Sequence, residues 1–518
     1  MSSESFISPA ACNRTEVFAV HGADPEVLAY AMAKYSRSSL SLRESLAEIS
    51  AQRAEQFLNT FYFQYGHRSI ADLAHVAMAV ERLSLLAAIE LVDEQRWDGQ
   101  ERSTRYQNFL QSGWFLPDFG QGEGRDSASA QLYSETVTGL FAVYQRVTAA
   151  VLDVLSRQVE RPATMKPEAC ERTLRARAFD VARYLLPLAT NTSLGQIVSA
   201  RTLETQIARL LSHPAAEVRD LGIKLREAAT GPAWNANATA GGTSCPEVHA
   251  APTLVKYAQP SDYLLRSRAE LSQAAAELLA GLPIAGVPSV DLVEPGESLE
   301  VELAATLLYS AAHHPYRQIR DLLAGFTESR VAEIIELGLR HRGRYDEALR
   351  VFQAGAALRF DLLMDIGGFR DLHRHRRTTQ ILQSFTTLHG YETPAGDIPD
   401  SSAPEEAGIL AAAGVLDLFQ SAVGHAHQAS ERIAAGHAPE AAQSALYLLP
   451  LATRIRSLFK MDFAEAQYII ELRSAPAGHF SYRRIAWEMF LALKRQHPSL
   501  AHHIRATDFR QPIDLLQR

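Results

Sequence analysis

A short basic run in the second half of the chain has the residue types that bind anions. Arg374–Arg377 holds three arginines and one histidine in four consecutive positions, and Ser384 follows eight positions after Arg376. Guanidinium groups make bidentate hydrogen bonds to phosphate, and a hydroxyl can add another. The run predicts an anion site, and the alternative interpretation is a solvated basic face at a helix end.

An internal repeat organises the elements that must position this run. The heptapeptide Tyr-Leu-Leu-Pro-Leu-Ala-Thr occurs at Tyr184–Thr190 and again at Tyr447–Thr453, 263 residues later. Such self-similarity is typical of architectures built from like units. We therefore expect one domain at residues 12–235, a second copy at residues 285–518, and a linker with a connecting helix at residues 236–284.

Apolar patterns recur at corresponding places in the two copies. A run near the start of each copy predicts a strand, at Val17–Val20 and at Val290–Val293. Each run leads into a helical segment, which ends at Tyr35 in the first copy and at Tyr309 in the second. Further helices are expected over Val137–Val147, Leu416–Val423 and Ser261–Leu282.

A glycine in the middle of each copy precedes what we interpret as a long helix. In the first copy Gly66-His67-Arg68-Ser69 comes before the helix, and the corresponding glycine of the second copy is Gly343. The first helix is predicted from apolar residues at helical spacing, namely Ile70, Leu73, Ala74, Ala77, Val80 and Leu83.

The composition is that of a soluble globular protein. Of the 518 residues 47% are hydrophobic and 21% are charged, and the net charge of −8 gives no overall basic field for a nucleic-acid polymer. Cys12, Cys170 and Cys245 are too scattered for a disulfide framework or a zinc site. The N-terminus lacks an apolar signal core, and the apolar run Leu73–Val92 contains charges. We therefore expect a cytoplasmic protein without a membrane segment.

The motif at Arg374–Ser384 resembles the Arg-His-Arg, seven residues, Ser signature of the flavin-dependent thymidylate synthases. Gly66–Ser69 resembles the family's Gly-His-x-Ser segment, whose serine contacts the flavin nucleotide. Gln100–Tyr106 resembles the second half of the signature, whose glutamate, serine and arginine hold dUMP. The resemblance spans nearly the whole chain as two tandem copies. It implies an α+β, helix-rich fold with a small sheet flanked by long helices.

Each copy keeps the half of the signature that the other lacks. The first copy has Asp93-Glu94-Gln95 in place of Arg-His-Arg. The second has Asp371 in place of a glutamine, and it lacks the Asn, Glu and late Arg, where Ile381, Leu382 and Thr386 stand. We expect a composite site with Arg374, His375 and Arg376 from the second copy and Glu101, Ser103 and Arg105 from the first. The alternative is that both copies have decayed and neither binds nucleotide.

Three arginines farther along resemble other segments of the family. Arg183 lies in an Ala-Arg segment, Arg201 follows Ser199 where the family has Asn-x-Arg, and Arg473 ends a Leu-Arg segment beside the pyrimidine ring. For Arg473 and its counterpart Arg209, surface charge on a helix is an equally open interpretation.

The resemblance implies a role for each of these residues. Those expected at the substrate are Arg374, Glu101, Ser103, Arg105, Arg183, Arg473 and Ser384. Those expected at the flavin are Ser69, His375, Arg376 and Arg201. Arg374 and Arg473 are the residues expected to be catalytic.

The implied activity is methylation of dUMP to dTMP with FAD as cofactor and with NADPH and methylenetetrahydrofolate as co-substrates. The family builds its sites from several chains of a homotetramer, which implies a homodimer that forms a pseudo-tetramer. A flavin- or nucleotide-binding protein without turnover, and a methylase of another pyrimidine, remain alternatives. His373 and His375 alternate as metal ligands can, but no third ligand of matching character follows, so no metal is expected.

Overall fold

The computed structural model describes residues 23–33, 41–48, 70–120, 126–234, 248–256, 258–294, 298–343, 346, 348–352, 358–394, 408–436, 440–502 and 504–516. The chain divides into two compact units. The smaller comprises the residues up to Val76 with Ser199–Arg201 and Ala228–Lys256, and the larger comprises Ala77–Val198, Thr202–Glu227 and Tyr257–Arg518.

The smaller unit contains the helices α1 (Pro25–Ala33) and α2 (Leu42–Glu48). The buried carboxylate of Glu26 in α1 accepts the backbone N–H groups of Thr253 and Leu254 at 2.9 and 2.6 Å. Burial raises the pKa of Glu26 despite these hydrogen bonds. One acidic side chain thus fastens the first helix to a segment more than 220 residues away in the sequence.

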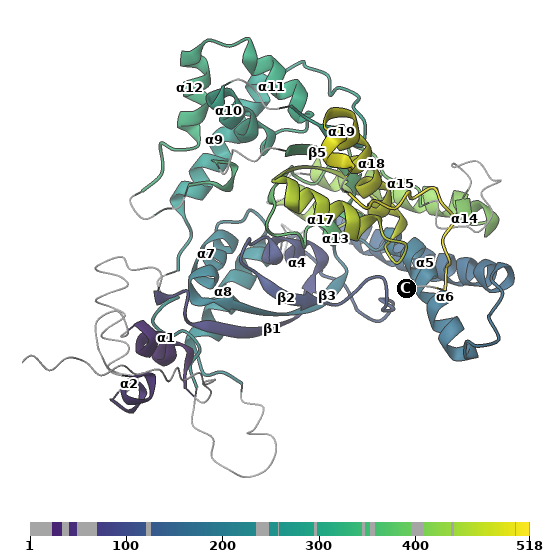
Figure 1. Ribbon diagram of the computed structural model, residues 1–518, viewed down its shortest axis with the longest axis horizontal. Coiled ribbons are helices and arrows are strands. Elements are labelled where there is room, and N and C mark those ends of the chain that lie inside the picture. Colours follow the sequence, from purple (N-terminus) through teal and green to yellow (C-terminus); the bar gives the residue numbers. More distant parts are fainter. Residues whose placement is uncertain are drawn as a thin grey trace, which may run out of the picture. The chain divides into compact units, whose positions relative to one another are not determined.

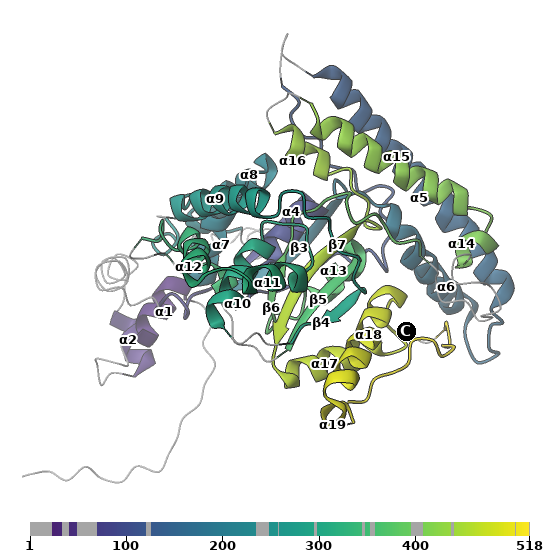
Figure 2. The ribbon, with the colours of Figure 1, turned by 90° about the horizontal axis from the view of Figure 1, so that it is seen from above.

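The larger unit holds most of the strands and helices of the two copies (Figures 1 and 2). The first copy contains β1 (His75–Ser84), α4 (Leu85–Val92), β2 (Asp98–Glu101), α5 (Ser127–Gln158), α6 (Pro167–Ala182), η5 (Arg183–Leu185), β3 (Asn191–Ser199), α7 (Ala200–Leu211) and α8 (Ala216–Thr230). The linker helix is α9 (Asp262–Leu278). The second copy begins with β4 (Val290–Leu292), α10 (Leu299–Tyr309), α11 (Tyr316–Ala324), α12 (Glu328–Leu337), η7 (Arg350–Phe352), β5 (Leu358–Asp365), α13 (Ile366–Leu372) and β6 (Thr379–Leu382). It ends with α14 (Gly408–Ala412), α15 (Leu416–Ala434), α16 (Ala441–Leu446), β7 (Arg454–Met461), α17 (Phe463–Ser474), α18 (Phe480–Gln496) and α19 (Pro498–Ala501).

The two sheets have the same strand order, which confirms the prediction of two like, helix-rich α+β copies. In the first sheet the order is β1-β3-β2, and in the second β5-β7-β6 with β4 added beside β5. The last strand pair is antiparallel in both, with Gln100 opposite Gly195 and Gln380 opposite Phe459. The strand that directly follows the heptapeptide, β3 or β7, therefore lies at the centre of its three-strand set.

The two heptapeptides pair with each other in an antiparallel manner. The N–H of Leu188 donates to the carbonyl of Leu449 at 2.9 Å, and the N–H of Leu451 donates to the carbonyl of Leu186 at 2.9 Å. The two hydrogen bonds exchange donor and acceptor between the copies, as a local two-fold relation requires. The repeat in the sequence is thus a contact between the copies in the fold.

Most of the predicted elements of the second copy are confirmed. A strand covers Val290–Leu292, a helix ends at Tyr309, and α5 and α15 occupy the two amphipathic stretches. The linker helix α9 begins where Ser261 caps it by accepting the N–H of Leu264 at 3.3 Å. The strand expected at residues 17–20 and the helix end at residue 35 lie outside the described residues.

The helix expected over residues 70–83 is wrong, because most of that segment is the strand β1. Ala74 and Val76 are buried, Met78 and Val80 are half-buried, and the residues between them are exposed. This alternation has period two, which places one face of a strand against the protein. The same residues also satisfy a helical spacing in part, and pairing with β3 decides between the two.

The long helix expected after Gly343 is also wrong among the described residues. The carboxylate of Asp346 accepts the N–H of Gly343 at 2.9 Å and closes a turn there. The chain then forms the short helix η7 and the strand β5. The apolar residues of β5 are buried on both faces, so their sequence shows no alternation that would have identified a strand.

The 32-residue helix α5 is, among the described helices, the one long and apolar enough to cross a membrane by length and composition. It packs against α6 and α15, as Figure 2 shows, and its residues Tyr133, Val137, Leu140, Tyr144 and Val147 are buried there. Packing against protein therefore accounts for its apolar character.

Candidate functional site

The arginine and histidine run lies in the connection between α13 and β6. The helix α13 begins at Asp365, whose carboxylate accepts the N–H of Gly368 at 2.6 Å, and it ends at Leu372. Because the helix ends before Arg374, the basic run does not lie on one continuous helix face. Arg374 and Arg377 are exposed, whereas His375 is buried.

Both ring nitrogens of His375 face other side chains. Its Nε2 accepts the Nε–H of Arg473 at 2.8 Å, and its Nδ1 lies 3.5 Å from a carboxylate oxygen of Glu465. Burial and the neighbouring charges of Arg473 and Arg376 lower the pKa of His375 to about 3. The imidazole is therefore neutral at physiological pH.

Arg376 reaches from the second copy to an aromatic ring of the first. Its guanidinium carbon lies 4.3 Å from the ring centroid of Trp97, which is cation–π distance. Burial lowers the pKa of Arg376 to about 10, and its Nε has no hydrogen-bond partner among the described residues. Trp97 is held by a 2.6 Å hydrogen bond from its indole nitrogen to Gln196.

The first-copy half of the signature is also tied to the second copy. Glu101, at the end of β2, forms an ion pair with Arg370 of α13. Arg105 is buried, donates to Asp180 at 2.8 Å and donates to the hydroxyl of Tyr482 at 2.8 Å. Burial alone would lower the pKa of Arg105, but the carboxylate of Asp180 raises it above its ordinary value. The hydroxyl of the neighbouring Ser103 accepts the Arg105 N–H at 3.2 Å, so this serine shapes the turn.

Arg183 is the most deeply buried arginine of the site, with 2% of its side chain exposed. One terminal nitrogen lies 3.2 Å from the carboxylate of Asp371, a residue of α13 in the second copy. Its Nε and its other terminal nitrogen have no hydrogen-bond partner among the described residues. Buried unpaired donors are costly, and an anionic group or a water that accepted both would remove that cost.

Asp371 connects the arginines of the two copies. Burial alone would raise its pKa, but Arg183, Arg105 and Arg374 together lower it, so Asp371 is a carboxylate among three cations. Arg105 and Arg473 also approach one ring, at 5.7 and 5.4 Å from the centroid of Tyr482. These contacts bring predicted residues of both copies into one network within a single chain.

Three predicted residues are not brought into this network. Ser384 follows β6 with an exposed side chain and forms no hydrogen bond with a described residue, because the preceding Gln383 is the one that turns inward. Arg201 belongs to the smaller unit, where it lies 3.2 Å from Asp72. Ser69 lies outside the described residues.

The first-copy positions that replace Arg-His-Arg have structural partners of their own. Asp93 lies 2.5 Å from Arg350 and 3.2 Å from His373. Burial alone would raise its pKa, but the charge of Arg350 and the hydrogen bond with His373 lower it. Glu94 lies 2.9 Å from Arg209. The acidic residues therefore fill the place of the lost cations with ion pairs between protein side chains.

Several residues of the network were not singled out from the sequence. No motif spacing identifies these residues, because they become neighbours of the arginines only through tertiary contacts. They are Trp97, Asp180, Glu465 and Tyr482. Among the residues that the structure describes, no group of three or more His, Cys, Asp or Glu side chains is placed to hold a metal. The two alternating histidines contact different side chains, His373 that of Asp93 and His375 that of Arg473.

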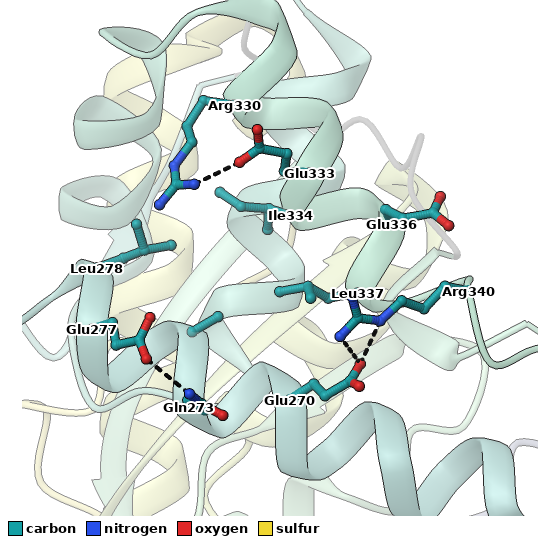
Figure 3. A pocket seen from close by; sticks show the side chains of 11 residues that line it. Glu270, Gln273, Glu277, Leu278, Arg330, Glu333, Ile334, Glu336, Leu337 and Arg340 are labelled. Atoms are coloured by element: carbon teal, nitrogen blue, oxygen red, sulfur yellow. Dashed lines mark hydrogen bonds and ion pairs between the residues drawn. The ribbon is translucent and has the colours of Figure 1, made fainter.

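A hollow of roughly 410 Å³ lies apart from this network, between α9 and α12 (Figure 3). Its two arginines already pair with carboxylates of the lining, with Arg340 2.7 Å from Glu270 and Arg330 2.5 Å from Glu333. It contains none of the predicted residues, and we do not assign it a ligand.

Two like α+β copies that share one cluster of arginines define a tandem-duplicated protein with a basic site. The family described as thymidylate synthase complementing protein matches residues 19–231 and again residues 293–499. The chain therefore belongs to this flavin-dependent family, in two tandem copies.

Relatives of similar length share this organisation along nearly the whole chain. A UPF0159 protein of Chlamydia muridarum is 29% identical, with 94% of this chain and 91% of the relative covered. A UPF0159 protein of Chlamydia pneumoniae is 28% identical, with 97% and 93% covered. One of Thermoplasma acidophilum is 25% identical, with 92% and 94% covered. The similarity thus extends across both copies and the linker.

Proposed function

We propose that this chain methylates dUMP to dTMP with FAD, NADPH and methylenetetrahydrofolate, at a site drawn from both copies. The observation that carries the proposal is Arg183, a buried cation with two unpaired N–H donors beside Arg105 and Arg374. Such donors suit the oxygens of a phosphate. Because the chain belongs to this family, we expect the phosphate to be that of a uracil nucleotide.

The proposed roles follow from where each side chain lies. Arg183 and Arg374 bind the phosphate. Arg105 fixes the position of the loop that follows β2 through its ion pair with Asp180. Arg473, which forms no ion pair with a described carboxylate, faces the pyrimidine carbonyls and stabilises the negative charge that develops as C5 becomes nucleophilic.

Arg376, with its unpaired Nε, fits a phosphate of the flavin nucleotide. Flavin binding by Ser69 and Arg201 stays a prediction of the family resemblance. FAD held there would supply the hydride that completes the methyl group, with NADPH as its reductant. The protein's own contribution is to hold and orient the groups around that chemistry. We propose that the enzyme works in the cytoplasm as a homodimer, which mass measurement by light scattering checks.

Release of tritium from C5 of labelled dUMP tests this function directly. The purified chain receives FAD, NADPH and methylenetetrahydrofolate, and tritium appears in water when the new carbon bond replaces the C5 hydrogen. We expect Arg374→Ala and Arg473→Ala to lose about 10²–10³-fold in kcat. Arg157→Ala, which removes an exposed arginine of α5 that pairs with Asp153 away from this network, is the control and keeps its rate.

A mixture of two inactive variants distinguishes a site within one chain from a site between chains. Arg105 and Arg374 both act on Asp371 of the same chain. Mixing Arg105→Ala with Arg374→Ala chains therefore restores no activity, whereas recovery would place the site between chains. If the wild type binds FAD and dUMP without tritium release, the nucleotide-binding alternative holds, which the internal carboxylate partners of Arg183 and Arg105 also favour.

A further inference from the structure

Arg473 is held differently from Arg105, Arg183 and Arg370. Arg105, Arg183 and Arg370 each form an ion pair with a carboxylate of the chain. Arg473 forms none with a described carboxylate, and its contacts are His375 and the ring of Tyr482. No carboxylate of the described residues therefore neutralises its positive charge.

The hydrogen bond to Arg473 fixes the protonation pattern of His375. An arginine has no acceptor, so Nε2 of His375 must accept and carries no proton. The single proton of the neutral ring then sits on Nδ1, which faces Glu465 at 3.5 Å. The side chains of His375 and Glu465 are only 4% and 6% exposed, so water competes little for either contact.

The elements make this arrangement rigid. Glu465 lies in the first turn of α17 and Arg473 in its last, eight residues or about 12 Å apart along the axis. The loop after α13 inserts His375 between them, and the ring of Tyr468, also on α17, meets the imidazole edge-on at 5.6 Å. One helix thus supplies both the residue that orients the imidazole and the arginine that the imidazole holds.

We propose that Glu465 and His375 are positioning residues, which aim the guanidinium of Arg473 at the substrate without neutralising it. An acidic partner in place of His375 would hold Arg473 equally well but would cancel its charge. A neutral acceptor leaves the two terminal nitrogens charged for a pyrimidine carbonyl. This inference rests on the proposed function for the identity of the substrate, and it replaces the expected role of His375 as a flavin ligand.

The first measurement reads the ring nitrogens of His375 and needs no activity. Nitrogen-15 NMR of histidine-labelled protein, with His375→Gln to assign the signals, should show a protonated Nδ1 and an unprotonated Nε2. Arg473→Ala should change the Nε2 signal and Glu465→Gln the Nδ1 signal. A proton on Nε2, or an imidazolium, overturns the proposal, and this readout stands even if the chain has no thymidylate synthase activity.

The second measurement separates positioning from flavin binding. Glutamine can place an acceptor near the position of Nε2, whereas leucine cannot. We expect His375→Leu to lower kcat for dUMP on the order of 10²-fold, since small misplacement of a catalytic group has effects of that size. His375→Gln should recover at least tenfold of that loss, and both variants should bind FAD as tightly as the wild type. Weakened FAD binding in both variants, or no recovery with glutamine, refutes the positioning role.

Discussion

Replacement of Asp371 by asparagine removes the carboxylate on which Arg183, Arg105 and Arg374 all act. Its oxygen lies 3.2 Å from Arg183, and 16% of its side chain is exposed. A phosphate that bound the unpaired nitrogens of Arg183 would lie about 5 Å from this carboxylate. Two like charges at that distance repel by about 3 kcal/mol when the effective dielectric constant is about 20.

Solvent and salt screen part of that repulsion, so we expect Asp371→Asn to bind dUMP ten- to a hundredfold more tightly. Calorimetric titration with dUMP and with deoxyuridine isolates the effect, because the nucleoside lacks the phosphate and its affinity should not change. Asp153→Asn, an exposed carboxylate in an i,i+4 pair with Arg157, is the control. Equal affinity of wild type and Asp371→Asn for dUMP would refute the placement of the phosphate at Arg183.

Two further predictions concern stability. His375 stays neutral in the fold with a pKa of about 3, whereas the unfolded chain takes up a proton near pH 6.5. Stability is therefore lost as pH falls from about 6.5 towards 3, by up to about 1.4 kcal/mol per unit, and urea midpoints at pH 7 and pH 5 should differ less in His375→Gln. Glu302→Gln leaves the buried cations Lys460 and Arg359, at 2.5 and 2.9 Å from its oxygen, without their carboxylate. It should cost about 3–5 kcal/mol in denaturant unfolding, with partial recovery in the double variant with Lys460→Met; an unchanged midpoint contradicts the assigned network.

The duplication was readable from the sequence because a seven-residue identity survives in both copies. Only the fold shows that the two heptapeptides pair with each other, since the backbone N–H groups of Leu188 and Leu451 donate hydrogen bonds across the contact between the copies. Helices with a clear apolar stripe, such as α5 and α15, were also predicted, because the stripe is visible in the local sequence. The strands β1 and β5 were missed, because pairing with a distant strand decides their conformation.

The arginines of the site could be named in advance, because guanidinium groups at motif spacing retain their chemistry wherever they lie. Their partners could not. The contact of Asp371 with Arg183 and the hydrogen bond that His375 accepts from Arg473 arise only from tertiary packing. Sequence spacing thus determined which cations the protein has, and tertiary packing decided which of them remain unpaired, because ion pairs form between side chains that no local pattern relates.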